Sequence, residues 1–289
     1  MMSFAVFADG TANLPGRLLD GISLLPCDYY TMDGVPGTYL GDLDAFDAHA
    51  YYDHLRSGRV IKTTLLNTEL FLARFTPLLQ QGIDVIYVSM SSGISGTYNA
   101  AVAAAQELMT KFNDRFVHIV DSLGCGFGSG MLAIQAADLS SKGTDAREAA
   151  TILDAEVSHA CQYFTVDDLN YLKRTGRVSG FTAKIATVLN IKPILFGDST
   201  GHIVSCGKTR GRKKAIEALA LKYKEKRTGE KKPTVYISHG DCLADAEQLS
   251  AMIQRITPDA SINICQHEPF SGAHVGPGML GLFFRGRER

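Results

Sequence analysis

The chain has 289 residues, of which 45% are hydrophobic and 20% are charged, and its formal net charge at pH 7 is -1. This composition is typical of a globular protein with room for one large or two ordinary domains. A nearly neutral charge argues against a nucleic acid partner, because proteins that bind nucleic acid over their surface are usually basic. No stretch approaches the roughly 20 apolar residues of a membrane span, and the start of the chain lacks a signal-peptide pattern. A cytoplasmic protein with no integral membrane segment is therefore expected.

Signals for metals and cofactors are weak. The six cysteines form no C-x-x-C pair and no cluster with histidines at zinc-ligand spacing. The glycine-rich run 124–130 does not match a dinucleotide fingerprint, because the third glycine would fall on Ser129. The run 207–209 resembles the end of a phosphate-binding loop, but the preceding glycine is one residue too far away. Neither a metal nor a cofactor is expected.

The first half alternates short β-rich runs with helical patterns. Three apolar runs bounded by polar turns are predicted as buried strands: 4–8, 84–89 and 116–120. An Ala-rich run predicts a helix from about 95 to 112, and a glycine-rich turn over 121–130 leads to a second helix at 131–141. A third helix is expected over 145–160. This alternation predicts an α/β fold with a Rossmann-like parallel sheet and helices on both faces, in an N-terminal domain of residues 1–160.

The second half has a different pattern and is predicted as a C-terminal α/β domain of residues 161–289 with a mixed sheet. The expected strands are 164–166, 191–196, 203–205, 234–238, 261–265 and 279–284. The expected helices are 169–174, 181–189, 212–227 and one between the strands at 234–238 and 261–265. Residues 197–201 have the composition of a hairpin turn.

Three segments of the first half carry candidate binding groups. Asp9 directly follows the first strand, where site residues of α/β folds gather, although an Asp/Gly turn that caps a helix is an equal alternative. The run 89–97 follows a strand and opens a helix, so its hydroxyls and backbone N–H groups suit a carboxylate or phosphate; simple N-capping is the alternative. Thr63 and Thr64 can donate two hydrogen bonds to one carboxylate, but on their own they fit a β-edge better.

The second half adds a histidine and basic residues. His274 lies in a Gly/Pro-rich run, 271–278, which predicts a loop, and as an imidazolium it could pair with a carboxylate; a turn histidine held by the backbone is the alternative. Lys173 and Arg177 flank a glycine turn, and Arg210 opens a second basic stretch. Such groups hold a phosphate or dock on an acidic partner, or they form a solvated surface.

An enzyme is the competing interpretation. Ser92 and His274, with Asp9 or Asp121, have the residue types of a serine hydrolase triad. The sequence lacks the G-x-S-x-G nucleophile elbow, which argues against this alternative on a lipid or ester substrate.

Taken in order, these segments resemble the DegV family of bacterial fatty-acid-binding proteins. The resemblance spans nearly the whole chain, in the stretches 8–15, 62–64, 91–98, 120–122, 168–179, 189–195 and 274–278. The sequence departs from the family pattern at Gly10, where a serine is usual, at Thr175, where a glycine is usual, and at 64–67, where T-S-Q-P is usual.

The resemblance implies a two-domain protein with one long-chain fatty acid buried in a tunnel between the domains. The family's carboxylate contacts map to Thr63 or Thr64, to Ser91 or Ser92, and to His274, with Asp9, Gly93 and Gly276 as further ligand-binding positions. The protein itself would be no enzyme. It would present the carboxylate to an ATP-dependent fatty-acid kinase related to dihydroxyacetone kinases, whose acyl phosphate product enters phospholipid synthesis. Arg177, with Lys173 and Arg210, would serve kinase docking or phosphate transfer.

Overall fold

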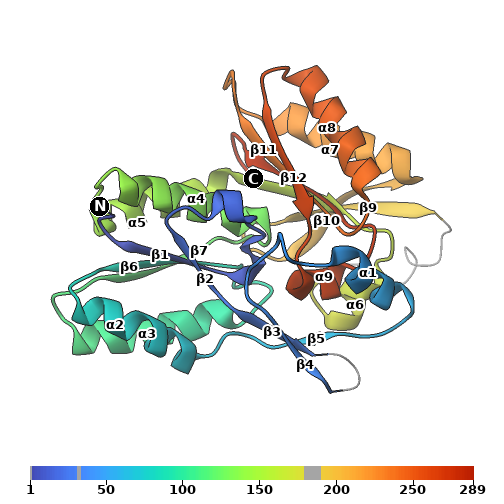
Figure 1. Cartoon of the computed structure of the whole chain (residues 1–289). Coiled ribbons are helices and arrows are strands. Elements are labelled where there is room, and N and C mark those ends of the chain that lie inside the picture. Colours follow the sequence, from blue (N-terminus) through green and yellow to red (C-terminus); the bar gives the residue numbers. More distant parts are fainter. Residues whose placement is uncertain (1, 31–33, 179–189) are drawn as a thin grey trace.

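The structure is a computed structural model that describes residues 2–30, 34–178 and 190–289. The helix expected at 181–189 lies outside these residues. In the part that is described, the strands form a four-stranded, a six-stranded and a three-stranded sheet (Figure 1).

The four-stranded sheet is parallel throughout, with the order β2-β1-β6-β7. Its strands are β1 (Ala5–Asp9), β2 (Ile22–Leu25), β6 (Val85–Ser89) and β7 (Val117–Asp121). Helices α4 (Phe127–Ser141) and α5 (Ala146–Glu156) cover one face, and α2 (Thr68–Gln80) and α3 (Thr97–Lys111) cover the other (Figure 1). Every residue of β6 is buried because both faces are covered. The Rossmann-like arrangement predicted from the sequence is thus confirmed.

The six-stranded sheet is mixed, as predicted, with the order β10-β9-β8-β13-β11-β12. Only the pair β11–β12 is parallel; the other neighbours run antiparallel. The strands are β8 (Ala160–Thr165), β9 (Ile191–Gly197), β10 (Ile203–Arg210), β11 (Thr234–His239), β12 (Ser261–Gln266) and β13 (Leu280–Arg285). Helices α7 (Arg212–Lys226) and α8 (Leu243–Ile256) pack on this sheet.

Helix α4 joins the two large sheets. The ring of Phe127 stacks on Tyr236 of β11 with 4.6 Å between ring centroids and meets Phe283 of β13 edge-on at 5.9 Å. The helix begins at Phe127, four residues before the predicted start, so the expected glycine-rich turn is partly helical. Glycine is required there because a Cβ on Gly130 would lie 2.4 Å from the backbone oxygen of Ala12. Gly130 therefore serves close packing of the helix, while Gly126, with a φ of 61°, forms the turn that leads into it.

Several elements were not predicted. Strands β3 (Cys27–Tyr30) and β4 (Pro36–Tyr39) are among them; they form a three-stranded antiparallel sheet with β5 (Lys62–Thr63), where a β-edge was expected. The short helices α1 (Ala48–Arg56) and α9 (Pro269–Val275) and the 3-10 turns η1 (Gly10–Ala12) and η2 (Gly16–Leu18) were not predicted either. In contrast, α6 (Asn170–Thr175) confirms the helix expected at 169–174, and the 3-10 turn η3 (Val157–His159) lies at the end of the helix expected over 145–160. None of the helices in the described ranges combines the length and hydropathy needed to cross a membrane.

Helix α1 packs against elements of the second half of the chain. The hydroxyl of Tyr52 donates to the backbone oxygen of His267 at 2.9 Å, and the hydroxyl of Tyr51 donates to that of Pro269 at 2.5 Å. Tyr171 of α6 donates back to the oxygen of Leu55 at 2.9 Å. These contacts hold α1, α6 and α9 together (Figure 1).

Candidate functional site

A cavity of about 440 Å³ lies among elements from both halves of the chain. Its size falls in the range of roughly 300–1,000 Å³ that is usual for small-molecule sites. The loops that follow β6 and β7, strand β5, the turn after α6 and helix α9 all contribute to its wall. Much of the lining is apolar and includes Leu65, Ile94, Phe164, Leu172, Phe270 and Met279.

Thr63 and His274 meet in this wall. The hydroxyl of Thr63 lies 2.8 Å from Nε2 of His274, and both residues are half-buried. Thr64 also lines the cavity, but its side chain is exposed. The expected β-edge is present, since Thr63 ends the two-residue strand β5 and pairs with Tyr29 of β3.

His274 lies on helix α9 and not in a loop, so that prediction was wrong. The helix forms because Glu268 caps it, accepting from the N–H groups of Phe270 at 2.5 Å and Ser271 at 2.9 Å, and because Pro269 occupies the first turn. Burial, together with the nearby charges of Arg177 and Arg174, lowers the pKa of His274 to about 4. Without a bound anion the imidazole is therefore uncharged at neutral pH, and the imidazolium expected from the sequence would need a carboxylate beside it. Its Nδ1 is buried and has no hydrogen-bond partner among the described residues.

The Ser91–Gly93 loop is fastened to the β9–β10 hairpin. Ser91 is buried, donates its hydroxyl to the backbone oxygen of Gly201 at 2.8 Å, and accepts from the N–H of Gly93 at 3.0 Å. A Cβ on Gly93 would lie 2.7 Å from the carbonyl carbon of Gly201. Ser92 differs: its backbone N–H donates to Asp121 at 3.1 Å, while its hydroxyl bonds to none of the residues that the structure describes. All three residues line the cavity.

The predicted basic residues are not gathered at one place. Arg177 follows Gly176, whose φ of 69° ends α6, and the half-buried arginine lines the cavity and donates to the backbone oxygen of Thr175. Lys173 is half-buried on α6, and Arg210 is exposed at the end of β10. Neither Lys173 nor Arg210 belongs to the cavity wall.

Asp9 and Gly276 also lie outside the wall. Asp9 is buried and accepts from the hydroxyl of Tyr87 at 3.0 Å and from the N–H groups of Thr11 at 3.0 Å and Met90 at 3.1 Å. Burial raises the pKa of this carboxyl. Gly276 has a φ of 74° at the end of α9, and a Cβ there would lie 2.4 Å from the ring of Tyr171. In this structure Asp9 therefore serves as a buried hydrogen-bond acceptor for its neighbours, and Gly276 leaves room for the ring of Tyr171.

The match to known proteins covers almost the whole chain. A family model described as "Uncharacterised protein, DegV family" matches residues 3–287. The chain belongs to the DegV family. A DegV domain-containing protein of Clostridium perfringens is 33% identical over 99% of this chain and 98% of its own length. Among solved structures, a DegV lipid-binding protein of Thermotoga maritima is 27% identical, with a TM-score of 0.84 over 100% of both chains. DegV of Bacillus subtilis, described as a fatty-acid-binding protein, is 26% identical, with a TM-score of 0.82 over 99% of this chain and 100% of its own.

This DegV chain does not form the hydrogen bonds of the hydrolase alternative. A triad needs a carboxylate at Nδ1 of the histidine and a serine at Nε2. Here Nε2 of His274 is bonded to Thr63, and Nδ1 meets no carboxylate among the described residues. Asp121 instead accepts from the N–H groups of Ser92 and Leu123, both at 3.1 Å.

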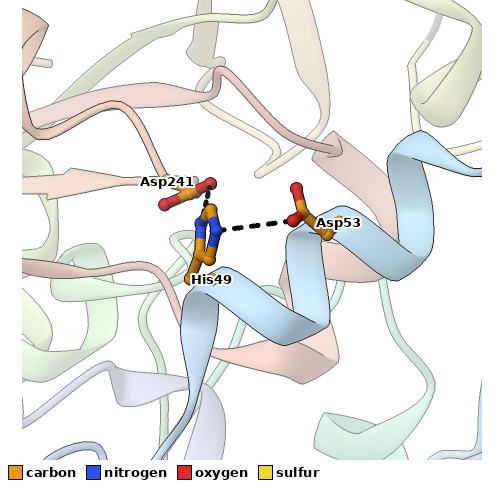
Figure 2. A group of neighbouring side chains, drawn as sticks. All are labelled: His49, Asp53 and Asp241. Carbon is orange, nitrogen blue, oxygen red and sulfur yellow. Dashed lines mark hydrogen bonds and ion pairs between the residues drawn. The ribbon is translucent and has the colours of Figure 1, made fainter.

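A polar group of this DegV protein outside the cavity has metal-ligand residue types. His49 and Asp53 of α1 converge on Asp241 after β11 (Figure 2). The ring of His49 lies 3.4 Å from Oδ2 of Asp53 and 3.1 Å from Oδ2 of Asp241. However, Nη1 of Arg56 lies 2.6 Å from an oxygen of each carboxylate and already supplies a positive charge. We interpret the group as an ion-pair network that fastens α1 to the loop after β11.

Sequence reasoning missed four polar residues of the cavity wall: Cys125, Gln162, His267 and Ser271. His267 and Ser271 come from one segment at the start of α9, whereas Cys125 and Gln162 come from two other segments that only the fold brings to it. The sequence signal nearest to them was the 271–278 run that drew attention to His274.

Proposed function

We propose that this DegV family member binds one long-chain fatty acid in the cavity, with its carboxylate at Thr63 and His274. The observation that carries the proposal is this hydrogen-bonded pair in the wall of a largely apolar cavity of about 440 Å³. The descriptions of the Thermotoga and Bacillus relatives as lipid- and fatty-acid-binding proteins support it. The ligand would lie between two domains, 1–160 and 161–289, because Thr63 comes from the first and His274 from the second.

The energetics favour such a ligand. Each buried CH₂ group contributes roughly 0.8 kcal/mol, so a 16-carbon chain gains on the order of 10 kcal/mol from burial. This gain offsets much of the free-energy cost of immobilising the acyl chain. A carboxylate can be buried only where donors replace its water. Thr63, the Ser92 hydroxyl and the imidazole of His274 are the donors proposed here, because Ser91 already donates to Gly201 and Thr64 is exposed.

We further propose that the bound carboxylate is presented to an ATP-dependent fatty-acid kinase of the dihydroxyacetone-kinase type, and that this chain performs no chemistry. The acyl phosphate would then enter phospholipid synthesis. Arg177 is the residue proposed to act in docking or phosphate transfer, because it lies in the cavity wall close enough to lower the pKa of His274. Lys173 and Arg210 would act only in docking, since they lie outside the wall.

Mass spectrometry tests the binding proposal directly. The intact protein is measured under native conditions, then denatured and its lipid extracted. The expected result is an excess mass that disappears on denaturation and is recovered as a fatty acid. Failure to bind any lipid after incubation with a panel of long-chain fatty acids would contradict the proposal.

The kinase proposal needs a separate test. Acyl phosphate formation is measured with a fatty-acid kinase, ATP and lipid-loaded protein, for the wild type, Arg177→Ala and Arg210→Ala. Arg177→Ala is expected to lose product while retaining its lipid, and Arg210→Ala is expected to lower the rate only at limiting protein concentration. Full product formation by Arg177→Ala would remove its assigned role.

A further inference from the structure

One polar part of the cavity wall includes Ser271, one turn of α9 before His274. His267, Ser271 and Cys125 all line the cavity. Nε2 of His267 lies 2.9 Å from the hydroxyl of Ser271, and Nδ1 lies 3.1 Å from the hydroxyl of Ser238. The same Ser271 hydroxyl is hydrogen-bonded to the carboxyl group of Glu268, which is fully buried.

This polar wall is unusual for a tunnel that holds a plain hydrocarbon chain. Both nitrogens of His267 already have hydrogen-bond partners, but the Ser271 hydroxyl keeps one acceptor position. Methylene groups form no hydrogen bonds, so a saturated chain would leave that position shielded from water and without a donor. A wall that selects only for hydrocarbon would be expected to carry aliphatic side chains at these positions. The polar groups therefore indicate a ligand that has a polar group of its own.

Ser271 has capacity for such a group. A serine hydroxyl has one donor and two acceptor positions, and Glu268 and His267 occupy two of the three. No hydrogen bond to a described residue fills the third, and the thiol of Cys125, whose pKa burial raises to about 12, lines the cavity beside it. A ligand hydroxyl that donates to this remaining acceptor position of Ser271 would therefore gain a hydrogen bond.

We propose that Ser271, flanked by His267 and Cys125, forms a subsite for a hydroxyl group on the acyl chain, and that the preferred ligand is a fatty acid hydroxylated near its carboxyl end. The inference rests on the proposed function, because it takes the carboxylate to lie at Thr63 and His274.

The position of the hydroxyl follows from helix geometry. Ser271 and His274 are three residues apart on α9, and side chains at that spacing lie on one face with Cβ atoms about 5–6 Å apart. An extended chain advances about 1.2 Å per bond. A hydrogen bond adds about 2.8 Å of reach. A substituent on carbon 3, 4 or 5 therefore meets Ser271, and one near the methyl end does not.

Binding measurements on delipidated protein test the subsite. The dissociation constants of hexadecanoic acid, 3-hydroxyhexadecanoic acid and 16-hydroxyhexadecanoic acid are compared by calorimetry. The 3-hydroxy acid is expected to bind roughly three- to tenfold more tightly than hexadecanoic acid, the equivalent of one net hydrogen bond. The 16-hydroxy acid is expected to bind more weakly, because its hydroxyl is buried without a partner.

Two matched variants assign the effect. Ser271→Ala is expected to bind both the 3-hydroxy and the plain acid with equal affinity. Ser238 is buried, lies outside the cavity wall, and has its hydroxyl hydrogen-bonded to the other nitrogen of His267. Ser238→Ala therefore removes a matched hydroxyl and is expected to keep the preference for the 3-hydroxy acid.

The outcomes separate the two proposals. Equal or weaker binding of the 3-hydroxy acid by the wild type overturns the subsite and leaves fatty-acid binding intact, whereas no binding of any acid overturns both. A preference that survives in Ser271→Ala also overturns the subsite. If that variant fails to fold, the comparison of the 3-hydroxy acid with hexadecanoic acid on the wild type still decides the matter.

Discussion

The hydroxyl of Thr63 lies 2.8 Å from Nε2 of His274, although 211 positions separate the two residues in the chain. Two local structures create this contact. Strand β5 pairs with β3 and ends at Thr63, and helix α9 packs against both strands. The contact between Thr63 and His274 therefore forms only when the C-terminal half of the chain packs against the three-stranded sheet of the N-terminal half.

Removing the Thr63 hydroxyl tests whether this pair receives the carboxylate. Thr63→Val keeps the shape of the side chain but deletes a donor, and a hydrogen bond to a charged group contributes about 1.5–3 kcal/mol. We expect fatty-acid affinity to fall at least about tenfold, measured by calorimetry. Thr64→Val is the control, because Thr64 is exposed. An equal loss in both variants would contradict the assignment.

The pKa of His274 predicts how binding depends on pH. In the free protein this pKa is lowered to about 4, and a bound carboxylate would raise it, since opposite charge favours the imidazolium. Binding then takes up a proton, so affinity should increase as the pH falls from 7.5 to 5.5, by at most about tenfold per pH unit. Isothermal titration in buffers of different ionisation enthalpy measures the proton uptake.

His274→Gln is the control for this effect. The variant retains a polar side chain and also retains Glu268, whose pKa is raised to about 7 and which titrates in the same range. We expect weaker binding with little pH dependence. If the affinity of the variant depended on pH as steeply as that of the wild type, the proton taken up on binding would belong to a group other than His274.

The large sheets were predictable because of their burial. Strands β1 and β6 are covered on both faces, so their sequences are continuous apolar runs that need no tertiary knowledge to detect. Strands β3, β4 and β5 have only two to four residues each. Segments this short are too brief to show the alternation of apolar and polar residues that identifies a strand. Helix α1, in contrast, has a sequence signal: Ala48, Tyr52 and Leu55 are its buried residues, at helical spacing, after the capping residue Asp47.

The candidate site was predictable in part. The motifs identified Thr63, Ser92, Arg177 and His274, which the structure brings to one cavity. The choice between neighbours needed coordinates, since Ser91 and Ser92 differ only in where their hydroxyls point. The loop prediction for His274 failed because composition alone cannot reveal that Glu268 caps a short helix there.

Asp9 is expected to act in stability rather than in binding. Asp9→Ala leaves the buried Tyr87 hydroxyl and the N–H groups of Thr11 and Met90 without their acceptor. Each loss costs about 1–3 kcal/mol, so we expect the free energy of unfolding to fall by more than about 3 kcal/mol in urea titrations. Asp20→Ala, at an exposed position, should change it by less than about 0.5 kcal/mol. A stable Asp9→Ala variant that no longer binds fatty acid would restore Asp9 to the binding site.

Glu268 should make stability depend on pH. Burial raises its pKa from 4.5 to about 7, so folding favours the protonated carboxyl. The stability that this group contributes is fully present below pH 4.5 and is lost as the pH rises through about 7. The difference between the two pKa values corresponds to on the order of 3 kcal/mol.

Glu268→Gln isolates this contribution, because glutamine keeps an oxygen that can accept from the first turn of α9 but cannot ionise. His239, His267 and His274, whose pKa values burial lowers, have the opposite effect: their contribution is present above pH 6.5 and is lost as the pH falls. Both proteins contain these histidines, so the wild-type minus variant difference in unfolding free energy cancels them. We expect that difference to decrease by on the order of 3 kcal/mol between pH 4.5 and pH 7.5 in urea titrations. Parallel pH profiles for the two proteins would mean that Glu268 remains ionised in the folded protein, held by the N–H groups of Phe270 and Ser271.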